Sequence, residues 1–222
     1  MDTLTYHNNP EFKVRIVHTA EDHRDADRFL QGDYLTTGGG EWRGCSVGCT
    51  VAPLLAAERD VPVTQLFGSR WHQEEARLLG IPEWLTRVQD AIFEGMGDDH
   101  VEWTPRLLAA IPVGVSHESL SVARDEWLRD LLHDPERGAV PAVARSLRGA
   151  GQSEHASNLE RITRETPFGE VRSGCYAATA APAAYYDYAA YYAYAAAVHG
   201  DDAAWWTWAG DRLIHRLTDT GV

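Results

Sequence analysis

Two cysteines spaced four residues apart, Cys45 and Cys49, are the side chains of this sequence whose types and spacing most suggest chemistry. The spacing predicts that both lie on one face of a helix, with Cys45 in its first turn. There the helix dipole and unpaired backbone amides favour a thiolate, and Arg43 adds positive charge nearby. One interpretation is a reactive thiol with Cys49 as its resolving partner, or half of a soft-metal site. The other is that both are small apolar core side chains, since free cysteine is among the most buried residue types.

His72 and Glu75 form a second candidate pair, because residues three apart lie on one side of a helix. The histidine could be the base for the Cys45 thiol or a metal ligand, and the carboxylate would then orient the imidazole. A solvated helix face is the competing interpretation. The candidate catalytic residues are therefore Arg43, Cys45, Cys49, His72 and Glu75.

The motifs of common hydrolases and of cofactor-binding proteins are absent from the sequence or lack the structural context that they need. Residues 44–48 match G-x-S-x-G, the nucleophile elbow of α/β-hydrolases, but that elbow must follow a buried strand. Here the three glycines at 38–40 and no apolar strand precede it, so a serine hydrolase is not predicted. The sequence has no dinucleotide fingerprint, P-loop, H-E-x-x-H motif, EF-hand loop or paired C-x2-C. We expect no cofactor and assign no metal ligands.

Aromatic residues concentrate near the C-terminus, where six of the nine tyrosines lie between residues 185 and 194 in an alanine-rich segment. Helical spacing places Tyr185, Tyr188 and Tyr192 on one face, and Trp206 lies on the following predicted helix. Such a face suits partner binding or self-association, since tyrosine and tryptophan are enriched at interface hot spots. Close helix packing through the alanines, with tyrosines filling the gaps, is an equal alternative. Trp42 joins the binding candidates because it follows the glycine-rich stretch, which predicts a tight turn or a ligand loop.

Capping and helix-breaking residues recur along the chain, while strand signals hardly appear. Asn9 and Pro10 begin a pattern that continues through Leu30 and ends at Gly32, although its first part also fits a short strand. Further helices are predicted near residues 45–59, 69–79, 82–95, 104–111, 116–133, 154–166, 183–198 and 201–218. The last two are separated by a short connection, which favours an antiparallel hairpin. The predicted fold is all-α, a compact helical bundle with a C-terminal antiparallel helical hairpin.

The composition becomes small and polar from Gly138 to Glu154, which predicts a hinge. We therefore expect two domains. Residues 1–150 would form a helical core domain with the glycine-rich loop and the cysteine motif. Residues 151–222 would form an alanine- and aromatic-rich helical hairpin packed on that core.

Charge and cysteine usage exclude several classes of protein. A formal net charge of −13 argues against nucleic-acid binding and against docking on anionic lipid. Three cysteines, an odd and low number, fit a reducing compartment. The polar N-terminus lacks the pattern of a signal peptide, and no apolar stretch is long enough to cross a bilayer. The sequence thus predicts a cytoplasmic protein.

Several motifs, in order along the chain, resemble those of a family of uncharacterised phage and prophage proteins. They are Trp42–Cys49 with its G-C-x-V-G-C pattern, His72–Glu75, Leu79–Pro82, Ile92–Gly95, Ala110–Gly114 and the segment Trp206–Ile214 after the alanine- and tyrosine-rich region. The resemblance implies an origin in a mobile element and no particular reaction. The family carries a histidine shortly after the second cysteine, where this chain has Ala52 and Pro53, and this departure argues against a four-ligand metal site.

These features together favour an intracellular binding or interaction protein whose partner is a protein or a small molecule. A homodimer through the aromatic hairpin is a candidate assembly. The alternative is a small thiol-dependent enzyme or redox protein that uses Cys45 with Cys49 or His72.

Overall fold

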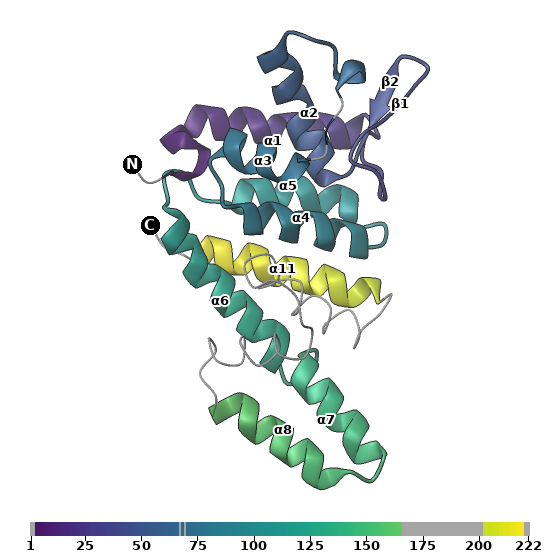
Figure 1. Cartoon of the computed structure of the whole chain (residues 1–222), viewed down its shortest axis with the longest axis vertical. Coiled ribbons are helices and arrows are strands. Elements are labelled where there is room, and N and C mark those ends of the chain that lie inside the picture. Colours follow the sequence, from purple (N-terminus) through teal and green to yellow (C-terminus); the bar gives the residue numbers. More distant parts are fainter. Residues whose placement is uncertain (1–2, 67, 69, 166–201, 220–222) are drawn as a thin grey trace. The chain divides into compact units, whose positions relative to one another are not determined.

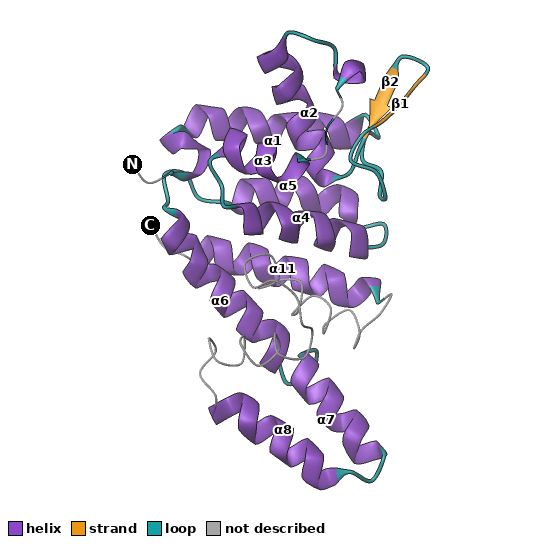
Figure 2. Ribbon diagram, viewed as in Figure 1, coloured by secondary structure: helices purple, strands orange, loops and turns teal. Residues whose placement is uncertain are grey.

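The computed structural model describes residues 3–66, 68, 70–165 and 202–219, and most of these residues are helical (Figures 1 and 2). The α-helices are α1 (Pro10–Asp25), α2 (Ser46–Arg59), α3 (Trp71–Leu79), α4 (Glu83–Gly95), α5 (His100–Ala110), α6 (His117–His133), α7 (Ala139–Gly149), α8 (Ser153–Glu165) and α11 (Ala203–Asp219). Two short 3-10 helices, η1 (Thr5–Asn8) and η2 (Val63–Gln65), lie before α1 and α3. The prediction of an all-α fold is confirmed. The predicted helix over 183–198, and with it the C-terminal hairpin, lies outside the described residues.

Helix α1 begins as the sequence predicts but ends earlier. The Asn9 side chain accepts a hydrogen bond from the backbone amide of Phe12, and Pro10 occupies the first helical position. The helix ends at Asp25 rather than continuing through Leu30, and residues 10–17 are helical rather than extended. Just past that end Asp27 adopts a left-handed conformation with φ 52°, which no α-helix can contain.

The glycine-rich stretch forms a two-stranded antiparallel hairpin, β1 (Thr36–Gly38) and β2 (Glu41–Arg43), in which Thr36 pairs with Arg43. Its turn consists of Gly39 and Gly40, both with positive φ, a conformation that glycine adopts without strain. This ribbon leads directly into α2 (Figure 1). It is the only sheet among the described residues.

The chain divides into two compact units, and the cysteine motif lies in the first, which comprises Met1–Ala123 and Trp206–Val222. In this unit α1 packs against α5, and α2 packs against α3 and α4. Apolar side chains at helical spacing form the core, and the buried side chains of α4 include Trp84, Leu85, Val88 and Ile92. The segment of α11 from Trp206 onward packs on α4 and α5, where Gly210 lies close to Ile92, Met96 and Trp103.

The second unit comprises Arg124–Trp205, so the division falls within α6 rather than at residue 150. Its helices α7 and α8 pack against each other, and Arg148 and Glu160 form an ion pair of 2.7 Å between them. The expected hinge at 138–154 is wrong for most of its length, because α7 occupies Ala139–Gly149. Helix α7 forms there because its apolar side chains are buried within this unit. Their burial outweighs the low helix preference of the flanking glycines.

Among the described residues, no helix combines the length and the apolar character needed to span a bilayer.

Candidate functional site

Cys45 caps the N-terminus of α2, one residue before the first helical position. Its sulfur accepts a hydrogen bond of 3.5 Å from the backbone amide of Gly48, and its own amide donates to the Asp33 carbonyl at 2.8 Å. The side chain is buried, with 1% exposed. Cys45 thus lies at the start of the helix, at the cap position rather than in the predicted first turn, and the Gly48 amide orients its sulfur.

Asp90 of α4 is the centre of the hydrogen bonds around this thiol. Its Oδ1 accepts from the Cys45 sulfur at 3.4 Å, and its Oδ2 accepts from the Tyr34 hydroxyl at 2.9 Å. The same Oδ2 lies 3.0 Å from Nε2 of His72 on α3. We call Tyr34, Cys45, His72 and Asp90 the Asp90 cluster. The side chains of His72 and Asp90 remain 16% and 18% exposed, so the cluster is accessible to water and small ions.

Glu94 extends the cluster, because it follows Asp90 by one turn of α4 and faces the same side. Ligating atoms of Cys45, Asp90 and Glu94 all lie within 4.8 Å of one another. Glu94 also accepts a hydrogen bond of 2.7 Å from the backbone amide of Gly32, which anchors its carboxylate. One sulfur and two carboxylates therefore converge at a single point.

The electrostatics of this point keep the thiol protonated. Burial, and then the charge of Asp90, raise the pKa of the Cys45 thiol far above its ordinary value, and the amide hydrogen bonds at the helix end offset only part of this. The same two causes raise the pKa of Tyr34 and of Glu94. The expectation that the helix terminus makes Cys45 a thiolate is thus wrong, because desolvation of the anion outweighs the helix dipole.

Cys49 and Arg43 do not join the Asp90 cluster. The Cys49 thiol donates to the backbone carbonyls of Gly44 at 3.3 Å and Arg28 at 3.5 Å, and burial raises its pKa to about 12. Arg43 forms an ion pair with Asp27 and donates to its carbonyl, away from the Cys45 thiol. Both described cysteines are free thiols.

His72 and Glu75, although three residues apart on α3, have different partners on α4. His72 contacts Asp90, whereas Glu75 accepts a hydrogen bond of 3.0 Å from the side chain of Gln89. Glu75 is fully buried. Gln89 also donates to the hydroxyl of Ser46, which is buried as well. The structure therefore does not bring His72 and Glu75 together as a base and its orienting carboxylate.

Burial raises the pKa of Glu75 well above its usual value of 4.5, with a smaller contribution from Asp90. The folded state then holds a proton that the unfolded state releases, so the free energy of unfolding falls as pH rises above about 4.5. We expect Glu75→Gln, a neutral and isosteric change, to remove this penalty. The advantage of the variant over the wild type in urea unfolding should be small at pH 4 and larger at pH 8. An advantage that does not change with pH would show that Glu75 is ionised in the folded protein.

The candidate binding residues that the structure describes are packed side chains. The Cζ atom of the Arg28 guanidinium lies 4.9 Å from the centre of the Trp42 ring. The ring of His23 meets the Trp42 ring edge-on, with the two ring centres 5.0 Å apart. Trp206 is buried, with 8% exposed, and contacts Gly95. Tyr185, Tyr188 and Tyr192 lie outside the described residues.

Sequence reasoning missed Tyr34, Asp90 and Glu94. Asp90 and Glu94 lie four apart on a helix with a clear apolar stripe, and this spacing alone resembles an ordinary solvated face. Their partners come from separate loops and helices at positions 34, 45 and 72. The only signal in the sequence was the spacing of four between the two carboxylates. It indicates a candidate site only once the fold has placed the Cys45 thiol beside them.

No family model matches the chain, and the searches of curated proteins and of solved structures return no match either.

Proposed function

We propose that this protein is a binding protein whose ligand is a divalent transition-metal ion held by Cys45, Asp90 and Glu94. The observation that carries the proposal is the convergence of three ligating atoms, one sulfur and two oxygens, within 4.8 Å of one another. They come from two helices, the capped start of α2 and one face of α4. The proposal replaces the expectation from sequence that the protein holds no cofactor.

The donor set favours a particular group of metals. A metal ion that binds the Cys45 sulfur would displace its proton, and a thiolate prefers zinc and other borderline or soft ions, whereas magnesium and calcium prefer all-oxygen sites. A zinc ion held by these three residues would keep one position for water or a bound molecule. The charge of Asp90 raises the pKa of both Cys45 and Glu94, so negative charge on these neighbouring groups is mutually unfavourable, and a bound cation would relieve the repulsion.

His72 and Tyr34 support this proposal as positioning residues. Both contact Oδ2 of Asp90 and so leave Oδ1, which accepts from the Cys45 sulfur, available to a metal ion. Hydrogen bonds of this kind orient ligating carboxylates, and their loss typically lowers metal affinity by about 10- to 100-fold. His72→Gln should therefore weaken metal binding without abolishing it.

Cobalt(II), a spectroscopic substitute for zinc, tests the site because a cobalt–thiolate bond gives a charge-transfer absorption band. In a Cys175→Ser background, we expect this band in the parent protein. It should disappear in Cys45→Ser, and Asp90→Asn and Glu94→Gln should each weaken cobalt binding at least about tenfold.

Cys49→Ser is the matched control, because Cys49 is equally buried and lies one turn further along α2, but its thiol donates to backbone carbonyls. It should retain the band. A band that survives in Cys45→Ser, or its absence from the parent protein, would refute the proposed metal site.

A thiol-dependent enzyme using Cys45 is the second candidate, favoured by one observation. Asp90 connects the Cys45 thiol to His72, which gives the thiol proton a route to an imidazole. Alkylation with iodoacetamide separates the two candidates. Rapid alkylation of Cys45 in the metal-free protein, much faster than that of Cys49, would favour the enzyme.

Three further parts of the proposal come from the sequence. The motif resemblance supports an origin in a phage or prophage, and the odd, low number of cysteines supports a cytoplasmic location.

The tyrosine-rich segment that contains Tyr185, Tyr188 and Tyr192 supports a homodimer or a protein partner. Size measurements on a Tyr185→Ala, Tyr192→Ala double variant would test the dimer, which a change to a monomer would support.

A further inference from the structure

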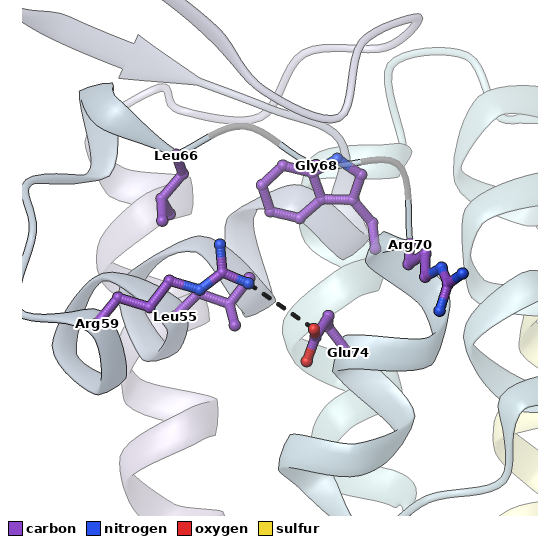
Figure 3. Close-up of a pocket in the computed structure, with 7 residues that line it drawn as sticks. Leu55, Arg59, Leu66, Gly68, Arg70 and Glu74 are labelled. Atoms are coloured by element: carbon purple, nitrogen blue, oxygen red, sulfur yellow. Dashed lines mark ion pairs between the residues drawn. The ribbon is translucent and has the colours of Figure 1, made fainter.

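A pocket of about 190 Å³ lies between the end of α2 and the start of α3, apart from the Asp90 cluster (Figure 3). The side chains that line it are Leu55, Arg59, Leu66, Arg70, Trp71 and Glu74. All of them belong to the first compact unit. From this pocket we infer a second binding site, for a small aromatic carboxylate.

The apolar walls of the pocket are suited to a flat ring. Leu55, Leu66 and Trp71 are buried side chains that face the cavity. Trp71 is held by a stacked contact with Tyr34, whose ring centre lies 6.3 Å away at an interplanar angle of 16°. A cavity of about 150 Å³ lined by apolar side chains accommodates benzene, so this one has room for a ring with a small substituent.

The charges around the pocket favour an anion. Two arginines and one glutamate line it, in a protein whose net charge is −13. Figure 3 shows Arg59 extending from α2 toward Glu74 on α3, with Leu55 beside it. The two side chains form an ion pair whose closest nitrogen and oxygen atoms are 3.8 Å apart, longer than a hydrogen bond.

Glu74 makes its closer contact with another arginine, because it accepts a hydrogen bond of 2.9 Å from Arg77 while its ion pair with Arg59 is 3.8 Å long. Among the described residues, the Arg59 guanidinium makes no hydrogen bond, and it lies next to the apolar wall. It can therefore donate to a carboxylate whose ring packs against Leu55 and Trp71. Arginine matches a carboxylate with two parallel hydrogen bonds, which fixes the orientation of the ligand.

Sodium benzoate is the probe for this site, measured by chemical-shift changes in a two-dimensional NMR spectrum of the full chain. We expect saturable binding with a dissociation constant on the order of 1 mM, a typical value for so small a ligand. Shifts should include the indole resonance of Trp71, assigned from a Trp71→Phe variant. Benzyl alcohol, which keeps the ring and lacks the charge, should bind at least about tenfold more weakly, and acetate should not bind measurably.

Arg59→Gln should weaken benzoate binding at least about tenfold while leaving the rest of the spectrum unchanged, since Arg59 is exposed. Arg15→Gln is the matched control, because Arg15 is an exposed arginine on α1 that does not line the pocket, and it should bind as the wild type does. Equal benzoate binding in Arg59→Gln, or equal binding of benzyl alcohol, would overturn the inference. The measurement needs no metal, so its outcome is independent of the proposed metal site.

Discussion

Gly48→Ala should destabilise this protein by about 3 kcal/mol or more, the largest effect we expect from adding one methyl group. A Cβ atom at Gly48 would lie 1.5 Å from the carbonyl oxygen of Tyr34 and 2.6 Å from its carbonyl carbon. Both contacts are with backbone, which cannot rotate away as a side chain can. The loop that carries Tyr34 must therefore move off the start of α2.

The displacement should also affect the Asp90 cluster, because the Tyr34 hydroxyl donates to Asp90 and the Gly48 amide donates to the Cys45 sulfur. We expect cobalt affinity to fall along with the urea midpoint. Gly38→Ala is the control: nothing lies within 4 Å of a Cβ there, and the change should alter stability by less than about 0.5 kcal/mol. Equal urea midpoints for Gly48→Ala and Gly38→Ala would contradict the close approach of Tyr34 to α2.

Trp206→Ala should destabilise the protein by about 3–5 kcal/mol, as is usual when a buried aromatic side chain is truncated. Trp206 covers Gly95 at the end of α4, where a Cβ atom would lie 2.3 Å from its ring. The sequence suggested Trp206 as a binding residue, and an exposed binding residue can be truncated at little cost to stability. Chemical unfolding therefore distinguishes the two roles.

A double variant sharpens this test. Gly95→Ala alone should be strongly destabilising because of the Trp206 ring, and it should cost much less when Trp206 is already alanine. Val14→Ala, at a position that is 53% exposed, supplies the control and should change stability by less than about 0.5 kcal/mol. If Trp206→Ala is no worse than Val14→Ala, the side chain is not part of the core and its role as a binding residue regains support.

The sequence by itself determined the helical architecture, because the signals for helices are local. Asn9 and Pro10 cap α1 as predicted. The apolar residues at helical spacing in the predicted helix over 116–133 are all buried in α6: Leu120, Ala123, Trp127, Leu128, Leu131 and Leu132. Periodicity of 3.6 residues and capping depend on neighbours within one or two turns, so a single sequence contains the information.

Predictions from local sequence were wrong where the burial of apolar side chains in the folded protein outweighed the local composition. Residues 138–154 contain several glycines and polar residues and were expected to be a hinge, yet α7 forms there because Ala139, Val140 and Ala144 are buried. The three glycines before the cysteine motif were predicted to form a tight turn or a ligand loop, and the structure has the tight turn, but the short ribbon on either side of it was not predicted. Pairing of two three-residue strands depends on the turn geometry rather than on any apolar alternation.

Tertiary structure alone decided the chemistry of the candidate site. The sequence places Cys45 at a helix start, where a thiolate is favoured, and the fold then buries the thiol beside Asp90, which favours the protonated form. It also separates His72 from Glu75 by giving each a different partner on α4. A pKa and a ligand set depend on which groups meet across the core, and residues separated by tens of positions meet only when the helices pack.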